Sequence, residues 1–117
     1  VMNLENYKIK PRSEFVSTCL QGHITCSYAE LVKVFGEPTI TETSGDDKVD
    51  IQWEMQVDDF DHNAIRPFTI YNWKDYDGGF EARSNPVYRW NIGGTSGIIS
   101  AYVTEYFNNT LNYSEAV

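Results

Sequence analysis

Strict alternation of apolar and polar residues marks the middle of the chain as a β-strand. Over residues 48–57 the apolar side chains are Val49, Ile51, Trp53, Met55 and Val57. Successive side chains of a strand point to opposite faces of a sheet, so these five belong to one face. The positions between them carry two acids and two amides. We therefore predict a half-buried strand whose second face is polar.

Two more strands are predicted further along the chain. Residues 65–74 place Phe68 and Ile70 on one face and Trp73 on the other. Pro67 has no N–H to donate, which indicates either an edge strand or a late start of pairing. The third strand is expected over 87–92, where two glycines end it.

Two helices are predicted, one short and one long. Ser27-Tyr28-Ala29-Glu30 is a capping box, in which the serine hydroxyl and the glutamate carboxylate each accept from the other residue's backbone N–H. Gly36 suits a left-handed C-cap, and Pro38 prevents the helix from resuming. Residues 98–107 repeat apolar side chains at helical spacing, which predicts about four turns that fray near 108–109.

The remaining segments carry weaker signals. Residues 1–12 are expected to form a loosely held arm, and 15–25 an extended segment or a β-turn-β excursion. Residues 75–86 are expected to form a long irregular loop. Consecutive strands with short polar connections imply antiparallel pairing, and two helices with single apolar stripes can cover one face. We predict a single α+β domain over residues 1–117: a two-layer sandwich in which two helices cover one face of a three- to five-stranded antiparallel sheet.

The charge of the chain changes this picture, because it is unevenly distributed. The net charge is −8 over 117 residues, and residues 42–81 hold eleven acids against three bases, a difference equal to the whole net charge. Such acidity argues against direct nucleic-acid binding, which depends on lysine and arginine. Carboxylates on a rigid sheet can instead bind a basic partner, although a solvated surface is the alternative. The candidate partner-binding residues are Asp46, Asp47, Asp50, Glu54, Asp58, Asp59, Asp61, Asp75 and Asp77.

A second candidate site lies where the third strand is expected to turn into the long helix. Glycines let backbone N–H groups converge, and a helix N-terminus favours an anion such as a phosphate. A tight turn in which Thr95 or Ser96 is the N-cap explains the same residues without a ligand. The candidate ligand-binding residues are Lys74, Arg89, Trp90, Gly93, Gly94, Thr95 and Ser96.

Other chemistry-bearing residues point to no enzyme. Residues 58–62 hold three carboxylates and a histidine, which suits a cation or an acid–base pair but also a solvated hairpin tip. The two histidines allow no catalytic set, so no metal or cofactor is expected. Of the three tryptophans, Trp73 is expected at the surface, because its strand face also carries Thr69 and Tyr71.

The cysteines and the N-terminal residues bear on location. Cys19 and Cys26 lack Cys-x-x-Cys spacing, and two buried thiols are favoured over a disulfide. The first residues lack the basic and then apolar plan of a signal peptide, and no apolar run approaches the length of a membrane span. We therefore expect a cytoplasmic protein without membrane partners.

An ordered set of motifs over roughly residues 20–105 resembles a set of small uncharacterised bacteriophage proteins. The motifs are Leu20-x-Gly22-x-Ile24, Tyr28-x-x-Leu31-x-x-x-Phe35-Gly36-x-Pro38, Lys48-Val49-x-x-x-Trp53, Ile70-Tyr71-x-Trp73-Lys74 and Trp90-x-Ile92-Gly93-Gly94. The resemblance implies a phage source and the host cytoplasm. By analogy, the first hypothesis is a non-enzymatic inhibitor of a host protein or defence system. Its acidic surface would bind a basic surface of that host protein, for example of one that handles nucleic acid. The alternatives are a nucleotide- or anion-binding module and a minor virion protein.

Overall fold

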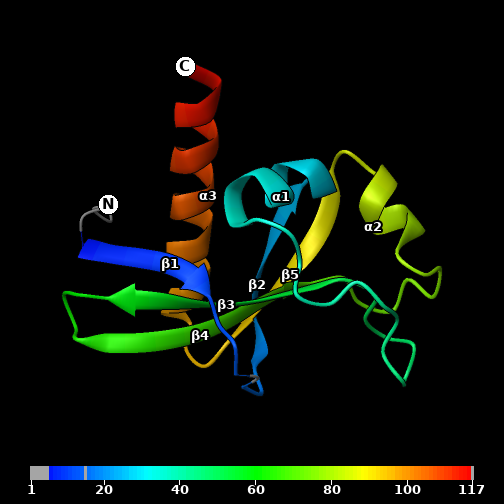
Figure 1. The fold of residues 1–117 in the computed structure, drawn as a ribbon, viewed down its shortest axis with the longest axis horizontal. Coiled ribbons are helices and arrows are strands. Elements are labelled where there is room, and N and C mark those ends of the chain that lie inside the picture. The colour runs from blue at the N-terminus through cyan, green and yellow to red at the C-terminus, as the bar shows by residue number, and fades with distance from the viewer. Residues whose placement is uncertain (1–5, 15, 117) are drawn as a thin grey trace.

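The protein is an α+β fold with a five-stranded antiparallel sheet, as predicted. The computed structural model describes residues 6–14 and 16–116. The strand order is β1-β3-β4-β5-β2. The strands are β1 (Tyr7–Pro11), β2 (Cys19–Cys26), β3 (Gln52–Asp59), β4 (Ala64–Tyr71) and β5 (Tyr88–Gly94), and the helices are α1 (Tyr28–Phe35), α2 (Phe80–Ser84) and α3 (Ile98–Ala116). All three helices lie on the same side of the sheet (Figure 1).

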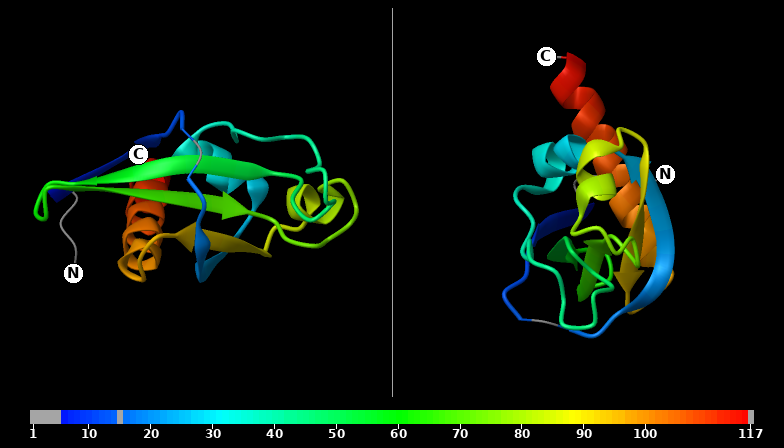
Figure 2. Two further views of the ribbon diagram at one scale, coloured as in Figure 1. Left: turned by 90° about the horizontal axis from the view of Figure 1, so that it is seen from below. Right: turned by 90° about the vertical axis from the view of Figure 1, so that its right-hand side faces the viewer.

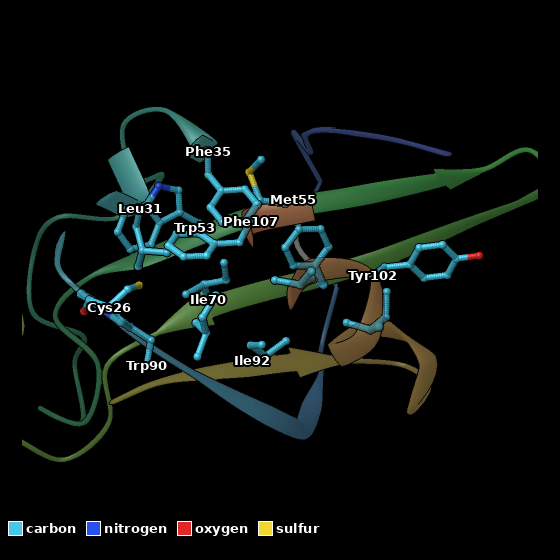
Figure 3. Close-up of a cluster of buried hydrophobic side chains, with 14 of the residues drawn as sticks. Cys26, Leu31, Phe35, Trp53, Met55, Ile70, Trp90, Ile92, Tyr102 and Phe107 are labelled. Atoms are coloured by element: carbon cyan, nitrogen blue, oxygen red, sulfur yellow. Dashed lines mark hydrogen bonds between the residues drawn. The ribbon is translucent and has the colours of Figure 1, made fainter. Parts of the chain in front are cut away.

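One face of the sheet forms the core with the helices. Trp53 of β3 pairs with Ile70 of β4, and Ile70 pairs in turn with Ile92 of β5, so these side chains share a face. They pack against Leu31 of α1 and Val103 of α3 in a single buried cluster (Figure 3). All five are 0 % exposed. The two-layer arrangement therefore follows from the alternating apolar pattern meeting two amphipathic helices.

The capping box predicted for α1 is confirmed. The Ser27 hydroxyl accepts from the Glu30 N–H at 3.1 Å, and the Glu30 carboxylate accepts from the Ser27 N–H at 2.9 Å. Gly36 ends the helix at φ +83° and ψ −171°, so its φ is positive as expected, but its ψ is extended rather than left-handed helical. Its N–H still donates to the Val32 carbonyl at 2.8 Å.

Pro67 lies just before the point where β4 gains its second partner strand, β5. This strand pairs with β3 along its whole length, but with β5 only from Phe68 onward. The missing N–H of Pro67 therefore lies just before the β4–β5 ladder starts, where no partner requires it. The late start of pairing is confirmed, and the edge position is not, because β4 lies inside the sheet.

The expected N-terminal arm is wrong for residues 7–11, which form the edge strand β1 paired with β3. Tyr7 is 4 % exposed, and its ring lies 4.8 Å from that of Tyr102. Ile9 also packs on the core, while Lys8 and Lys10 point away from it. The period-two pattern was thus present in the sequence. Residues 1–5 of the expected arm lie outside the described residues.

Three other expected boundaries are corrected. The loop predicted over 75–86 contains the short helix α2, which buries Ala82 at 0 % exposure. The two glycines predicted to end the third strand lie within β5. Helix α3 does not fray at 108–109 but continues to Ala116, since Leu111 packs against the core one turn later.

The extended segment predicted over 15–25 is confirmed as β2 from Cys19 onward, and Phe15 lies outside the described residues. Its connection to β1 must join the two edges of the sheet. It crosses the face opposite the helices (Figure 2, left). The Arg12 guanidinium donates to Gln56 at 3.0 Å, and the Thr18 and Thr69 hydroxyls are 3.1 Å apart. The rest of this open face has no helix over it.

Candidate functional site

The acidic strand face predicted from the sequence is not continuous, because two of its carboxylates are buried. Asp50 is 1 % exposed. It accepts from the Thr43 hydroxyl at 2.7 Å and from the Asn72 side-chain amide at 2.8 Å. The Asn72 carbonyl oxygen accepts from the backbone N–H groups of Asp50 and Ile51. Asp50 therefore holds the start of β3 to the end of β4, and it is not available to a partner.

Asp59 is the second buried carboxylate, also at 1 % exposure. Its Oδ2 accepts from the Tyr102 hydroxyl at 2.6 Å, from His62 Nδ1 at 2.8 Å and from Arg66 Nε at 3.0 Å. Burial alone would raise the pKa of Asp59, but the bonds from Tyr102, Arg66 and His62 outweigh it and hold the pKa well below its usual range. Of the side chains expected as a cation site or acid–base pair, only Asp59 and His62 thus join this network, in which the Asp59 carboxylate is buried and the His62 side chain is 58 % exposed.

The other candidate acids are divided between two ends of the molecule. At the β3–β4 hairpin, Asp61 is exposed and Asp58 lies 3.5 Å from the Lys10 ammonium. At the opposite end, the loop before β3 and the loop after β4 carry the rest (Figure 1). Glu54 is half-buried between these ends.

The loops at that second end lie against each other. The Lys74 N–H donates to the Lys48 carbonyl at 2.7 Å and joins them. Between them is a hollow of about 310 Å³ lined by residues that include Asp47 and Tyr76. Asp77 caps α2 by accepting from the N–H groups of Gly79 and Glu81.

Two aromatic side chains stand exposed among these carboxylates. Tyr76 is 63 % exposed, and Phe80 is 72 % exposed. Asp46, Asp47 and Asp77 are also exposed, while Asp75 is half-buried. The Ser44 hydroxyl and the Lys48 N–H donate to Asp46 and lower its pKa, so it stays charged. We call Asp46, Asp47, Tyr76, Asp77 and Phe80 the acidic end.

The glycines of the predicted anion site serve close packing. A Cβ on Gly94 would lie 3.0 Å from Ile99 of α3. A Cβ on Gly93 would lie 2.6 Å from the hydroxyls of both Thr18 and Thr69. Both glycines are paired within the sheet, with β2 on one side and β4 on the other. Their backbone groups are thus engaged in strand pairing.

The structure does not bring the residues of that site together. Trp90 is 0 % exposed, and its indole N–H donates to the Cys26 carbonyl at 3.1 Å. Lys74 follows the end of β4 that pairs with Asn91, whereas Gly94 lies at the other end of β5. Thr95 and Ser96 continue past Gly94, and Arg89 is exposed near the start of the strand. The counter-charges therefore lie far from the glycines.

Trp73 is surface-exposed, as predicted, at 44 %. The ammonium groups of Lys48 and Lys74 lie 5.9 and 5.7 Å from the centroid of its ring. Beside it, where β5 begins, is a shallow hollow of about 450 Å³. We call this the open-face hollow; its lining includes His23, Trp73, Asp75, Glu81, Arg89 and Asn91.

No family model, curated protein or solved structure matches the chain. Within residues 6–14 and 16–116, no helix combines the length and apolar character needed to cross a bilayer. The same residues contain no cluster of three or more His, Cys, Asp or Glu side chains that would hold a metal ion. Both cysteines are free thiols, and Cys19 is exposed rather than buried as expected.

Several residues of these two surfaces were not among the predicted site residues. His23 and Asn91 pair across β2 and β5, and Asn91 pairs with Tyr71 across β4 and β5, so all three share the open face. That grouping depends on strand register, which the pattern of a single strand does not contain. For Tyr76 and Phe80 a signal existed, because aromatic residues in an acidic irregular loop are candidates for exposure.

Proposed function

We propose that this protein is a non-enzymatic binding protein whose acidic end docks onto a basic surface of a partner protein. The observation that carries the proposal is the exposure of Tyr76 and Phe80, at 63 % and 72 %, among the carboxylates of Asp46, Asp47 and Asp77. Aromatic side chains are enriched at protein–protein interfaces relative to the rest of a protein surface. The acidic strand face predicted from the sequence does not serve as the docking surface, because Asp50 and Asp59 are buried.

The two kinds of side chain have different tasks in such an interface. Aromatic anchors supply most of the binding free energy when a partner covers them. Surrounding carboxylates steer a basic partner into contact and disfavour acidic ones, which raises the association rate more than the affinity. The net charge of −8 strengthens this selection.

The resemblance to small bacteriophage proteins supplies the biological setting. In that setting the partner is a protein of the host, and the acidic end acts as an inhibitor by occupying a basic site that the host protein uses. A host enzyme or defence protein that handles nucleic acid presents such a site, because it must neutralise phosphates.

The test is affinity capture from a host extract, followed by rate measurements with the recovered protein. The variant Asp46→Asn/Asp47→Asn removes two charges and preserves turn geometry, since asparagine tolerates the positive φ of +62° at position 47. We expect a basic protein to be recovered, with an association rate that falls about tenfold in this variant and with added salt. Tyr76→Ser/Phe80→Ser is expected to speed dissociation instead.

The matched control is Asp61→Asn, which removes an exposed charge at the opposite end of the molecule. It should leave both rates unchanged. Equal effects of Asp61→Asn and Asp46→Asn/Asp47→Asn would show that only net charge matters and would refute a docking surface at the acidic end. Unchanged dissociation after loss of both aromatic rings would refute their role as anchors.

A further inference from the structure

The open-face hollow combines a stacking surface with cationic groups. Trp73 is 44 % exposed, whereas Trp53 and Trp90 are 0 % exposed. The Tyr71 ring meets the Trp73 ring edge-on, with centroids 6.1 Å apart and planes at 80°. This contact holds the indole in place on the open face. A fixed, accessible indole is a surface on which a planar ring stacks at little entropic cost.

Three of the nine basic residues of the chain lie at this ring or in the hollow beside it: Lys48 and Lys74 over the ring, and Arg89 in the lining of the hollow. The ammonium groups of Lys48 and Lys74 lie within 5.9 and 5.7 Å of its centroid. Arg89 lines the same hollow, and its guanidinium lies 3.1 Å from His23 Nδ1. In a chain of net charge −8, such a grouping of cations beside one exposed aromatic ring favours an anionic group of a ligand.

The two carboxylates in the lining limit how much negative charge the hollow accepts. Asp75 already accepts hydrogen bonds from the Tyr88 hydroxyl and the Asn72 amide. Glu81 accepts from the Asn85 amide at 3.0 Å. Their remaining lone pairs can accept from hydroxyl groups. The lining therefore fits a ligand with a planar ring, hydroxyls and a single anionic group, and it disfavours a polyanion.

We propose that the open-face hollow binds a mononucleotide. The base stacks on Trp73 in place of a lysine ammonium group that lies over the ring. The phosphate pairs with Arg89 in the hollow, and the ribose hydroxyls face Asp75 and Glu81. A volume of about 450 Å³ is within the range that small-molecule sites occupy. A nucleic acid strand is disfavoured, because three cations cannot offset the repulsion between a polyanion and the acidic chain.

Tryptophan fluorescence tests this proposal on the intact protein. Trp73 is the solvent-exposed tryptophan, so a base stacked on it quenches the emission that comes from the surface. We expect nucleoside monophosphates to quench with a Kd on the order of 0.1–1 mM, since one stacked base and one paired phosphate contribute modest affinity. The matching nucleosides should bind about tenfold more weakly, because they lack the phosphate.

Variants identify the groups involved. Arg89→Gln should raise the Kd for the nucleotide about tenfold and leave that for the nucleoside unchanged. Trp73→Leu should abolish binding of both, which calorimetry measures without the fluorophore. Lys33→Gln is the control, because Lys33 is an exposed cation in the last turn of α1. It should leave the nucleotide Kd unchanged.

Several results would overturn the proposal. One is the absence of quenching and of heat by all four common nucleoside monophosphates at millimolar concentration. Another is an equal rise in the nucleotide Kd in Arg89→Gln and Lys33→Gln, which would show a nonspecific effect of charge. Equal affinity for nucleoside and nucleotide would remove the phosphate subsite. The Asp46→Asn/Asp47→Asn variant should bind the nucleotide at least as tightly as the native chain, so failure here and failure of partner docking are distinguishable.

Discussion

Replacing Asp59 by asparagine should destabilise the protein substantially, because its carboxylate is buried and hydrogen-bonded. Three side-chain donors converge on Asp59 Oδ2: the Tyr102 hydroxyl, His62 Nδ1 and Arg66 Nε, at 2.6, 2.8 and 3.0 Å. Because an ionised carboxylate only accepts, His62 Nδ1 carries its hydrogen in this arrangement. The network ties α3 to the β3–β4 hairpin, whose tip otherwise extends into solvent (Figure 1).

The expected magnitude follows from the burial of the carboxylate. An asparagine keeps one acceptor oxygen but no charge. If that oxygen takes the Oδ2 position, the amide NH₂ group takes the Oδ1 position and faces the backbone N–H of His62. Breaking a buried charge network by removing one partner costs about 3–5 kcal/mol. Tyr102→Phe removes a single donor to the charge and should cost about 1.5–3 kcal/mol. A domain of this kind is stable by about 5–15 kcal/mol, so Asp59→Asn should still fold, but marginally.

The pH dependence has a definite sign. The pKa of Asp59 is lower in the folded protein than the value of about 3.9 for an unfolded aspartate. Its contribution to stability is therefore complete well above that unfolded pKa and is lost as the pH falls below it toward the folded pKa. Urea unfolding should be measured between about pH 7 and pH 3. The difference in unfolding free energy between the native chain and Asp59→Asn should narrow below about pH 4.

Two outcomes would refute this reasoning. If Asp59→Asn unfolds at the same urea concentration as the native chain at neutral pH, the network contributes no net stability. If the difference in unfolding free energy between the two proteins does not narrow in acid, the lowered pKa of Asp59 is not the source of that difference. Asp61→Asn is the control, because Asp61 lies at the same hairpin but is exposed. It should change the unfolding free energy by less than about 0.5 kcal/mol.

Three further predictions concern packing, thiol chemistry and capping. Gly94→Ala should cost about 1–3 kcal/mol in thermal or urea unfolding, because the added Cβ would lie 3.0 Å from Ile99; unchanged stability would contradict the close packing. One thiol, Cys19, should react with an alkylating reagent in the native state, since Cys26 is buried and its burial raises its pKa to about 12; peptide mapping that finds Cys26 labelled equally fast would contradict this. Ser27→Ala should cost about 1 kcal/mol of unfolding free energy through loss of the capping box, whereas Ser27→Asp should retain most of it.

The features predicted correctly are those whose cause is local in sequence. The α1 capping box needs only Ser27 and Glu30, and the alternation in β3 needs only its own residues. The late start of pairing at Pro67 follows from its missing N–H. The same logic applied to Tyr7 and Ile9 would have found β1, where the short pattern was outweighed by the polar residues around it.

The features predicted wrongly depend on contacts between distant segments. Alternation assigned Asp50 to an exposed face, but Asn72, twenty-two residues away, folds over it and supplies the hydrogen bond that makes its burial tolerable. Gly93 and Gly94 have the composition of an anion-binding turn. Thr18, Thr69 and Ile99 determine that they are packing positions instead. No property of the glycines themselves distinguishes these two uses.

The buried carboxylates also change how the charge of the molecule should act. A surface that attracts a basic partner acts through charges the partner can approach, and Asp50 and Asp59 contribute little because their hydrogen bonds and burial hold them inside the fold. The remaining exposed acids lie at two separate ends, and Asp58 at the hairpin end is already paired with Lys10. The hairpin end exposes one aromatic ring, that of Phe60, at 60 %. At the acidic end Asp46 lies 3.9 Å from the Lys48 ammonium, but Asp47 and Asp77 are also exposed there, together with two exposed aromatic rings. That combination of steering charge and apolar anchor, rather than the total of −8, is why the acidic end is the stronger candidate for binding a protein.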